Sequence, residues 1–188
     1  MAESKLKLYM VMLGCTPEGR LTEQHDIFFG IGTSLKELLP DMIASWPEAK
    51  GQLHIDVWRE VTSVDGFSIE VIERTAETNP GRHLFFLNLG GYKKNEFEEY
   101  HYKVLTVAPT LAAALKASKK TAFYKHFGFK GATSHVDEKY GIDVDDAFKV
   151  EDMLGLQLKE RYQLKITEKI LVAEDRLHIG YLKLSKLI

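Results

Sequence analysis

The sequence predicts an α+β fold made of two tandem β-β-α-β-β repeats, related by an approximate two-fold and followed by a C-terminal β extension. Residues 8–25 align with residues 84–101 at an offset of 76 positions, and residues 54–69 align with residues 135–150 at an offset of 81. These two matches predict an internal duplication. Within each copy, short strand-like segments surround one helical segment, a pattern that favours antiparallel α+β folds over a doubly wound parallel sheet.

The repeat boundaries follow from the same alignment. We assign residues 6–73 to repeat one, 74–82 to a linker, 83–154 to repeat two and 155–188 to the C-terminal β extension. The linker is polar and turn-rich, which is typical of a connection between units. Each repeat alone would bury little apolar surface, so we expect the two repeats to share a core.

Repeat one is expected to form, in order, strands at 6–13 and 25–32, a helix at 35–46, and strands at 54–61 and 67–73. The first segment is a continuous apolar run that ends at Gly14, as in a buried strand. The helix has apolar residues at three- and four-residue spacing after a Thr or Ser N-cap, and Pro40 is expected to break or kink it. Asp65 and Gly66 predict a hairpin that joins the last two strands.

Repeat two follows the same order, with strands at 83–89 and 101–107, a helix at 109–125, a strand at His135 and a strand around Phe148. The alanine-rich composition of its helix favours helix formation directly. Beyond the repeat, the segments 162–166 and 178–184 are apolar and strand-like. We expect both segments to pair with, or cover, a sheet edge.

Histidines and aspartates recur at matching places in the two copies. Each repeat has a His-x-Asp pair on a predicted strand, and the two-residue spacing places both side chains on the same face of the sheet. Each repeat also has a histidine two residues after a glutamate, Glu23 or Glu99. The candidate polar cluster consists of His25, His54, Asp56, His101, His135 and Asp137.

Two interpretations of this cluster are open. A histidine and an aspartate on a half-buried strand often hydrogen-bond a neighbouring turn, and the sequence has no dense metal motif such as HExxH, so a structural role is our first interpretation and no metal is predicted. The alternative is one divalent metal site per copy, formed by the same residues. Three further carboxylates, Asp143, Asp145 and Asp146, are expected to lie in a solvated turn.

A candidate anion site lies in the segment 123–137, where glycines alternate with lysines and hydroxyl groups. Its four candidate ligands are Lys125, His126, Lys130 and Ser134. The segment lacks the spacing of a P-loop, and C-terminal capping of a helix is our first interpretation of its residues, ahead of anion binding.

Composition excludes several classes of protein. The net charge is −2, with 45% hydrophobic and 28% charged residues, so the chain is expected to fold compactly and to bind neither nucleic acid nor a membrane surface. Cys15 is the only cysteine, which excludes an intramolecular disulfide and fits a reducing compartment. Without a secretory signal or an apolar stretch of spanning length, we expect a cytoplasmic protein, and no cofactor is indicated.

Seven short motifs carry a family resemblance. They are LGGY (89–92), EQHD and EYHY around His25 and His101, HID and HVD at the two His-x-Asp pairs, and VDGF with DDAF. With these motifs the chain resembles, over roughly residues 6–188, a bacterial family of tandemly repeated proteins, the domain of unknown function 1543. The resemblance implies a cytoplasmic bacterial protein with a duplicated unit. It implies no activity, and in copy one LGGY is replaced by LGCT.

Function is predicted mainly from the motifs that are missing. The sequence lacks an ordered catalytic triad, an activated cysteine and a nucleotide-binding fingerprint. Our first hypothesis is therefore a non-catalytic binding or assembly protein that forms a homodimer through β edges or its tryptophan-bearing surface. The alternatives are a metal-dependent, hydrolase-like enzyme that uses the His/Asp pairs, and a binder of a small anion or phosphorylated metabolite.

Overall fold

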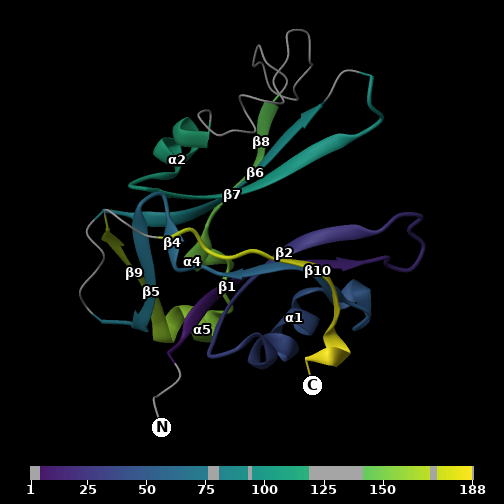
Figure 1. The fold of residues 1–188 in the computed structure, drawn as a ribbon, viewed down its shortest axis with the longest axis horizontal. Coiled ribbons are helices and arrows are strands. Elements are labelled where there is room, and N and C mark those ends of the chain that lie inside the picture. The colour runs from purple at the N-terminus through teal and green to yellow at the C-terminus, as the bar shows by residue number, and fades with distance from the viewer. Residues whose placement is uncertain (1–4, 76–80, 93–94, 119–141, 170–172, 188) are drawn as a thin grey trace. The chain divides into compact units, whose positions relative to one another are not determined.

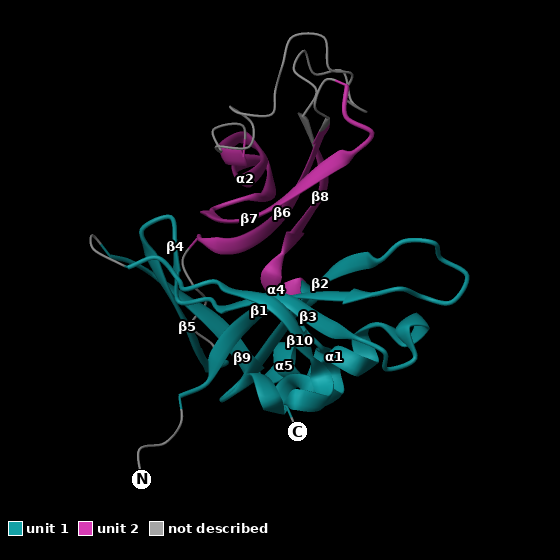
Figure 2. Ribbon diagram, turned by 45° about the vertical axis from the view of Figure 1, so that its right-hand side comes forward, with its two compact units in different colours: residues 1–77, 153–188 teal, residues 78–152 magenta. Residues whose placement is uncertain are grey.

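The computed structural model describes residues 5–75, 81–92, 95–118, 142–169 and 173–187. The chain divides into two compact units, which Figure 2 colours separately. Unit 1 comprises residues 1–77 and 153–188, and unit 2 comprises residues 78–152. Both units are mixed α+β with antiparallel sheets, as the sequence predicts. None of the helices in the described ranges is long and apolar enough to span a membrane.

The main sheet of unit 1 has four antiparallel strands in the order β10-β3-β1-β2 (Figure 1). These strands are β1 (Lys7–Cys15), β2 (Gln24–Gly32), β3 (His54–Glu60) and β10 (His178–Lys183). Alternate side chains of a strand point to opposite faces of the sheet. The odd-numbered residues of β1 from Tyr9 to Cys15 are buried in a core that they share with the helical segment. The even-numbered residues of β1, Gly14 among them, therefore line the opposite face of the sheet.

The helical segment between β2 and β3 has three short parts, η1 (Leu35–Leu38), α1 (Leu39–Ser45) and η2 (Pro47–Ala49). The predicted helix is thus broken next to Pro40, which lies in the first turn of α1 and starts that helix. Ser34 is the N-cap of η1 but makes no side-chain cap hydrogen bond. Instead, the Glu37 carboxylate accepts hydrogen bonds from the backbone N–H and the hydroxyl of Thr33, at 2.7 and 2.6 Å.

A second, three-stranded sheet of unit 1 has the order β4-β5-β9. Its strands are β4 (Ser63–Val64), β5 (Phe67–Glu73) and β9 (Tyr162–Glu168), and α5 (Leu156–Arg161) precedes β9. Asp65 and Gly66 form a tight turn with φ of 53° and 80°, as predicted. The turn joins β4 to β5, however, and does not join β3 to β5, because the chain leaves the first sheet after Glu60. Both C-terminal strands pair with edges, β9 with β5 and β10 with β3.

Unit 2 contains a three-stranded antiparallel sheet in the order β7-β6-β8. Its strands are β6 (His83–Tyr92), β7 (Glu99–Ala108) and β8 (Ile142–Lys149). The helix α2 (Leu111–Ser118) follows β7, and α4 (Val150–Met153) follows β8. Apolar side chains of β6, β7 and α2, including Leu87 and Ala114, form the core of this unit.

The strand registers correct the predicted alignment of the second block. In unit 1, His54 lies opposite Gly14, and in unit 2 Asp143 lies opposite Gly90. The two glycines are 76 positions apart, but His54 and Asp143 are 89 apart and not 81. The strand around Phe148 is β8, which pairs with β6 as β3 pairs with β1. The expected strand at His135 lies outside the described residues.

Candidate functional site

Two histidines of unit 1 flank a glycine on the central strand. Gly14 of β1 pairs with His25 of β2 on one side and with His54 of β3 on the other. Directly opposite residues on neighbouring strands project to the same face. Since glycine has no side chain, the two imidazoles face each other across an open position.

Asp56 reaches this position because β3 contains a β-bulge. Ile55 pairs with Leu13 and Val57 pairs with Met12, so Asp56 is the extra, unpaired residue between them. A bulge re-aims the side chain of the extra residue. The Asp56 carboxylate lies 3.4 Å from His54 Nε2 through Oδ1 and 3.3 Å from His25 Nε2 through Oδ2.

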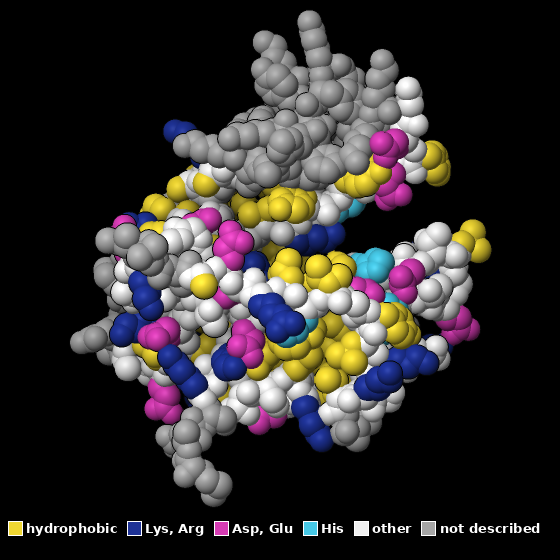
Figure 3. All heavy atoms as spheres, in the orientation of Figure 1, with side chains coloured by type: hydrophobic (Ala, Val, Ile, Leu, Met, Phe, Trp, Pro, Cys, Tyr) yellow, Lys and Arg dark blue, Asp and Glu magenta, His cyan; other side chains and the backbone are white. Residues whose placement is uncertain are grey.

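Glu23 completes the group from the chain just before β2. Its carboxylate lies 3.0 Å from His54 Nε2 through Oε1 and 3.5 Å from His25 Nε2 through Oε2. We call Glu23, His25, His54 and Asp56 the unit 1 cluster. Figure 3 shows histidine side chains beside acidic ones on the surface of this unit, over the β1–β2 hairpin. The side chain of His54 is 9% exposed, whereas that of Glu23 is 45% exposed, so the cluster extends from the sheet to the surface.

The close approaches in the unit 1 cluster do not give its buried polar atoms hydrogen-bond partners. His54 Nε2 and Asp56 Oδ2 are buried and have no hydrogen-bond partner. A buried polar atom without a partner costs about 1–3 kcal/mol, so native proteins nearly always pair such atoms. Their geometry therefore does not fit a set of mutual hydrogen bonds that holds a loop.

Gly14 makes the convergence possible. A Cβ atom at this position would lie 2.5 Å from His54 Nε2 and 2.6 Å from Asp56 Oδ2, closer than real Cβ contacts. Any other residue at position 14 would therefore displace two members of the unit 1 cluster. The ring of Tyr181, from β10, lies 4.4 Å from the His54 ring and supports the imidazole from the side.

Unit 2 has a related group on its own sheet. Single ligand atoms of Glu99, His101 and Asp145 all lie within 4.8 Å of one another, and His101 Nε2 is 3.2 Å from Asp145 Oδ2. We call these residues the unit 2 cluster. His101 lies opposite Gly90, and a Cβ atom at Gly90 would collide with the Asp145 carboxylate.

Asp145 corrects the expected role of the acidic segment 143–146. Val144 pairs with Leu89 and Asp146 pairs with Asn88, so Asp145 is the extra residue of a bulge in β8. The segment is therefore a strand and not a solvated turn. Asp145 occupies the position in unit 2 that Asp56 occupies in unit 1, and sequence reasoning missed it.

The structure brings together some of the predicted site residues. His25, His54 and Asp56 meet in unit 1, and His101 meets Asp145 in unit 2. The remaining six lie outside the described residues: Lys125, His126, Lys130, Ser134, His135 and Asp137.

Two neighbouring groups have shifted pKa values. Burial raises the pKa of the Cys15 thiol, and the Glu23 carboxylate raises it further. Cys15 projects into the core on the far side of the sheet, so it is no member of the cluster. Burial lowers the pKa of Lys103 on β7, while the Asp145 carboxylate acts in the opposite direction.

A cavity of about 750 Å³ in unit 1 lies elsewhere. Its walls come from β2, α1 and residues 153–158, and they include Phe28 and Trp46. None of the residues of the unit 1 cluster lines it. We take the unit 1 cluster as the candidate functional site, because the cavity contains no comparable group of metal-binding or catalytic side chains among the described residues.

Comparison with known proteins gives a family and a fold. Residues 20–71 match the model of the family described as Domain of Unknown Function (DUF1543). The match confirms the predicted resemblance to this family over these residues. The DUF1543 match contains all four residues of the unit 1 cluster.

Among the solved structures that match, one covers nearly the whole chain. It is the crystal structure of a protein Il1583 from Idiomarina loihiensis, with a TM-score of 0.58 and 22% sequence identity. The similarity covers 95% of this chain and 97% of that chain, and at this identity it concerns the fold alone. No curated protein matches the sequence.

Proposed function

We propose that this protein is a metal-binding protein and that the unit 1 cluster holds a divalent transition-metal ion. The observation that carries the proposal is the pair of buried, unpartnered atoms, His54 Nε2 and Asp56 Oδ2, which face a second histidine and a second carboxylate. A metal ion between these groups would satisfy both atoms at once. Imidazole and carboxylate together suit Zn²⁺, Fe²⁺ or Ni²⁺.

The spacing of the groups supports the same conclusion. Zinc bonds to histidine nitrogen and carboxylate oxygen measure about 2.0–2.2 Å, so ligand atoms at the corners of a tetrahedron lie about 3.3–3.6 Å apart. The four His–carboxylate distances in the unit 1 cluster range from 3.0 to 3.5 Å. These four distances are close to this spacing, but among the described residues only the unit 2 cluster has three single ligand atoms that all lie within 4.8 Å of one another, so the unit 1 side chains would have to close around the ion.

The equivalent positions in unit 2 support a site that belongs to a duplicated unit. Glutamate, histidine, glycine and aspartate recur in matching places of the two sheets, and the bulge in the third strand recurs with them. We propose that the repeated unit is β-β-α-β, with β1–β3 and β6–β8 as its strands. Our first interpretation, in which the residues hold loops through hydrogen bonds, is less well supported because the buried atoms lack such bonds.

A metal-dependent hydrolase is the second candidate function. Catalytic zinc sites have three protein ligands and an open position for water, and the unit 2 cluster offers three donors. If this function is correct, metal-loaded protein hydrolyses an activated ester or phosphoester, and His101→Ala abolishes the activity. Metal binding without hydrolysis would leave the non-catalytic binding protein as the better description.

Metal analysis of untagged protein tests the main proposal. We expect inductively coupled plasma mass spectrometry to find a stoichiometric divalent metal after purification or reconstitution. His54→Ala should lose the ion of unit 1 with an unchanged circular dichroism spectrum. His178→Ala is the matched control, because His178 stacks on Trp58 at 3.9 Å and lies outside the cluster. If wild-type protein retains no metal after reconstitution, the proposal is refuted.

A homodimer, a cytoplasmic location and a bacterial source remain predictions. Dimerisation through β edges is supported by β10, an edge strand whose Ile179 and Tyr181 are 80% and 63% exposed. Light scattering measures the mass directly. A mass of one 21.4 kDa chain at micromolar concentration would exclude a stable dimer.

A further inference from the structure

The sheet faces beside the two clusters differ in one respect. Next to the cluster glycine, each sheet has a row of three directly opposite residues, on β1, β2 and β3 in unit 1 and on β6, β7 and β8 in unit 2. In unit 1 the row is apolar, and in unit 2 it is polar. The apolar row is Met12, Ile27 and Val57, and the polar row is Asn88, Lys103 and Asp146.

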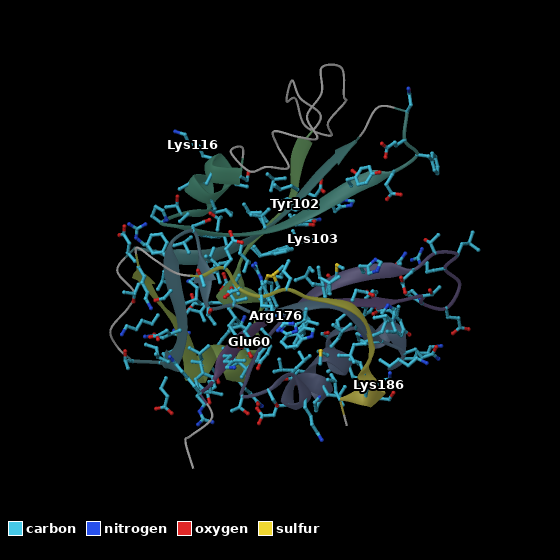
Figure 4. The ribbon with its side chains drawn as sticks, in the orientation of Figure 1. Glu60, Tyr102, Lys103, Lys116, Arg176 and Lys186 are labelled. Atoms are coloured by element: carbon cyan, nitrogen blue, oxygen red, sulfur yellow. The ribbon has the colours of Figure 1, made fainter. Side chains whose placement is uncertain are left out.

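The polar row lies on the same face as the unit 2 cluster. Lys103 follows His101 by two residues on β7, which places both side chains on one face of the sheet. Figure 4 labels Lys103 on this strand. Asn88 Nδ2 donates to Asp146 Oδ2 at 3.4 Å, while Asn88 Oδ1 is buried and has no hydrogen-bond partner.

The fold itself does not require these polar side chains. Unit 1 builds the same three-strand arrangement with a methionine, an isoleucine and a valine in the row. A buried acceptor without a partner destabilises a protein. Lys103 Nζ donates a long hydrogen bond to the His101 carbonyl oxygen, at 3.4 Å, while Asn88 Oδ1 has no partner. A ligand that contacts both side chains would account for their presence in the row.

We propose that unit 2 binds a small oxyanion that carries an adjacent hydroxyl group, with its oxygens on the metal of the unit 2 cluster. This inference rests on the proposed metal-binding function. The ammonium group of Lys103 pairs with the negative charge, and Asn88 Oδ1 accepts the hydrogen bond of the hydroxyl. The three protein donors leave coordination positions for the oxygens of the ligand.

The charges make the binding depend on the metal. Glu99, Asp145 and Asp146 contribute three negative charges, and Lys103 contributes one positive charge. Without a metal this face repels an anion, whereas a divalent ion brings the balance of these groups to zero. Metal-free protein is therefore expected to bind no anion at this site.

Isothermal titration of zinc-loaded and zinc-free protein tests the inference, with glycolate, acetate and inorganic phosphate as probes. We expect glycolate to bind only the zinc-loaded protein, and acetate, which lacks the hydroxyl, to bind several-fold more weakly. Lys103→Gln should weaken glycolate binding by about tenfold, as expected for a charge-assisted hydrogen bond. Asn88→Met should reduce glycolate affinity to that of acetate. Phosphate that binds more tightly than glycolate, with the same dependence on Lys103, would assign the ligand as a phosphate and not a carboxylate.

The variants carry their own controls. Asn88→Met introduces the residue of unit 1, so the fold is expected to tolerate it. Lys116→Gln removes an exposed lysine of α2 (Figure 4) and should leave anion binding unchanged. If zinc binds but no probe does, or if Lys103→Gln binds them all as wild type, the inference is wrong. If zinc itself does not bind, the proposed function fails first.

Discussion

The substitution Gly14→Ala should abolish metal binding by unit 1 without unfolding the protein. The added Cβ would lie 2.5 Å from His54 Nε2 and 2.6 Å from Asp56 Oδ2. Ordinary contacts begin near 3.4 Å, so each atom must move by 0.8–0.9 Å. Metal ligands tolerate displacements of only about 0.2–0.5 Å.

The expected size of the effect follows from that displacement. Loss of a supporting residue around a metal typically costs about 10–100-fold in affinity, and here two ligands move together. We therefore expect zinc affinity in unit 1 to fall by about 100-fold or more. The fold should survive, because the displaced atoms are the ends of side chains and the cost of overpacking is about 1–3 kcal/mol.

Competition with a chromophoric zinc chelator gives the affinity, and thermal denaturation of metal-free protein reports the fold. Gly155→Ala is the matched control, since a Cβ atom there meets nothing within 4 Å and its φ of −56° suits alanine. If Gly14→Ala binds zinc as tightly as Gly155→Ala does, the unit 1 cluster is not the site.

Four further outcomes are expected. Gly90→Ala should remove only the metal of unit 2, and a stoichiometry that stays at the wild-type value would contradict this. Asp175 accepts hydrogen bonds from the backbone and hydroxyl of Thr62, so Asp175→Ala should lower the free energy of unfolding by about 1.5 kcal/mol, measured in urea. Burial raises the pKa of Tyr9 to about 12, and the nearby Glu60 adds to this. The unfolded chain then ionises first, and between pH 9 and pH 11 wild type should lose about 1 kcal/mol more stability than Tyr9→Phe. Because burial raises its pKa, Cys15 should react with a thiol reagent at pH 8 far more slowly in native than in denatured protein.

The strands of repeat one were predictable because their apolar runs end at glycines and prolines. Repeat two was harder, because the match of His54 and Asp56 to His135 and Asp137 suggested a register that the sheet does not have. The position of β8 is set by its backbone pairing with β6. The aspartates of β8 have low strand propensity, so local sequence does not predict a strand there. Sequence patterns alone do not report such tertiary pairing.

The candidate site was predictable in part. The repeated histidines identified His25 and His54, and two-residue spacing placed Asp56 beside them. Asp145 was missed because an acid-rich segment resembles a turn and because no sequence pattern predicts the position of a β-bulge. The available signal was that Gly14 and Gly90 occupy equivalent positions of the two copies. Only a residue without a side chain leaves room there for the carboxylate.

Anomalous diffraction from zinc-soaked crystals of the untagged protein tests the central claim most directly. The account predicts a zinc peak between Glu23, His25, His54 and Asp56, at bonding distance of about 2.0–2.2 Å from both Nε2 atoms. If the peak is absent there while the four side chains keep their places, the unit 1 cluster does not bind metal.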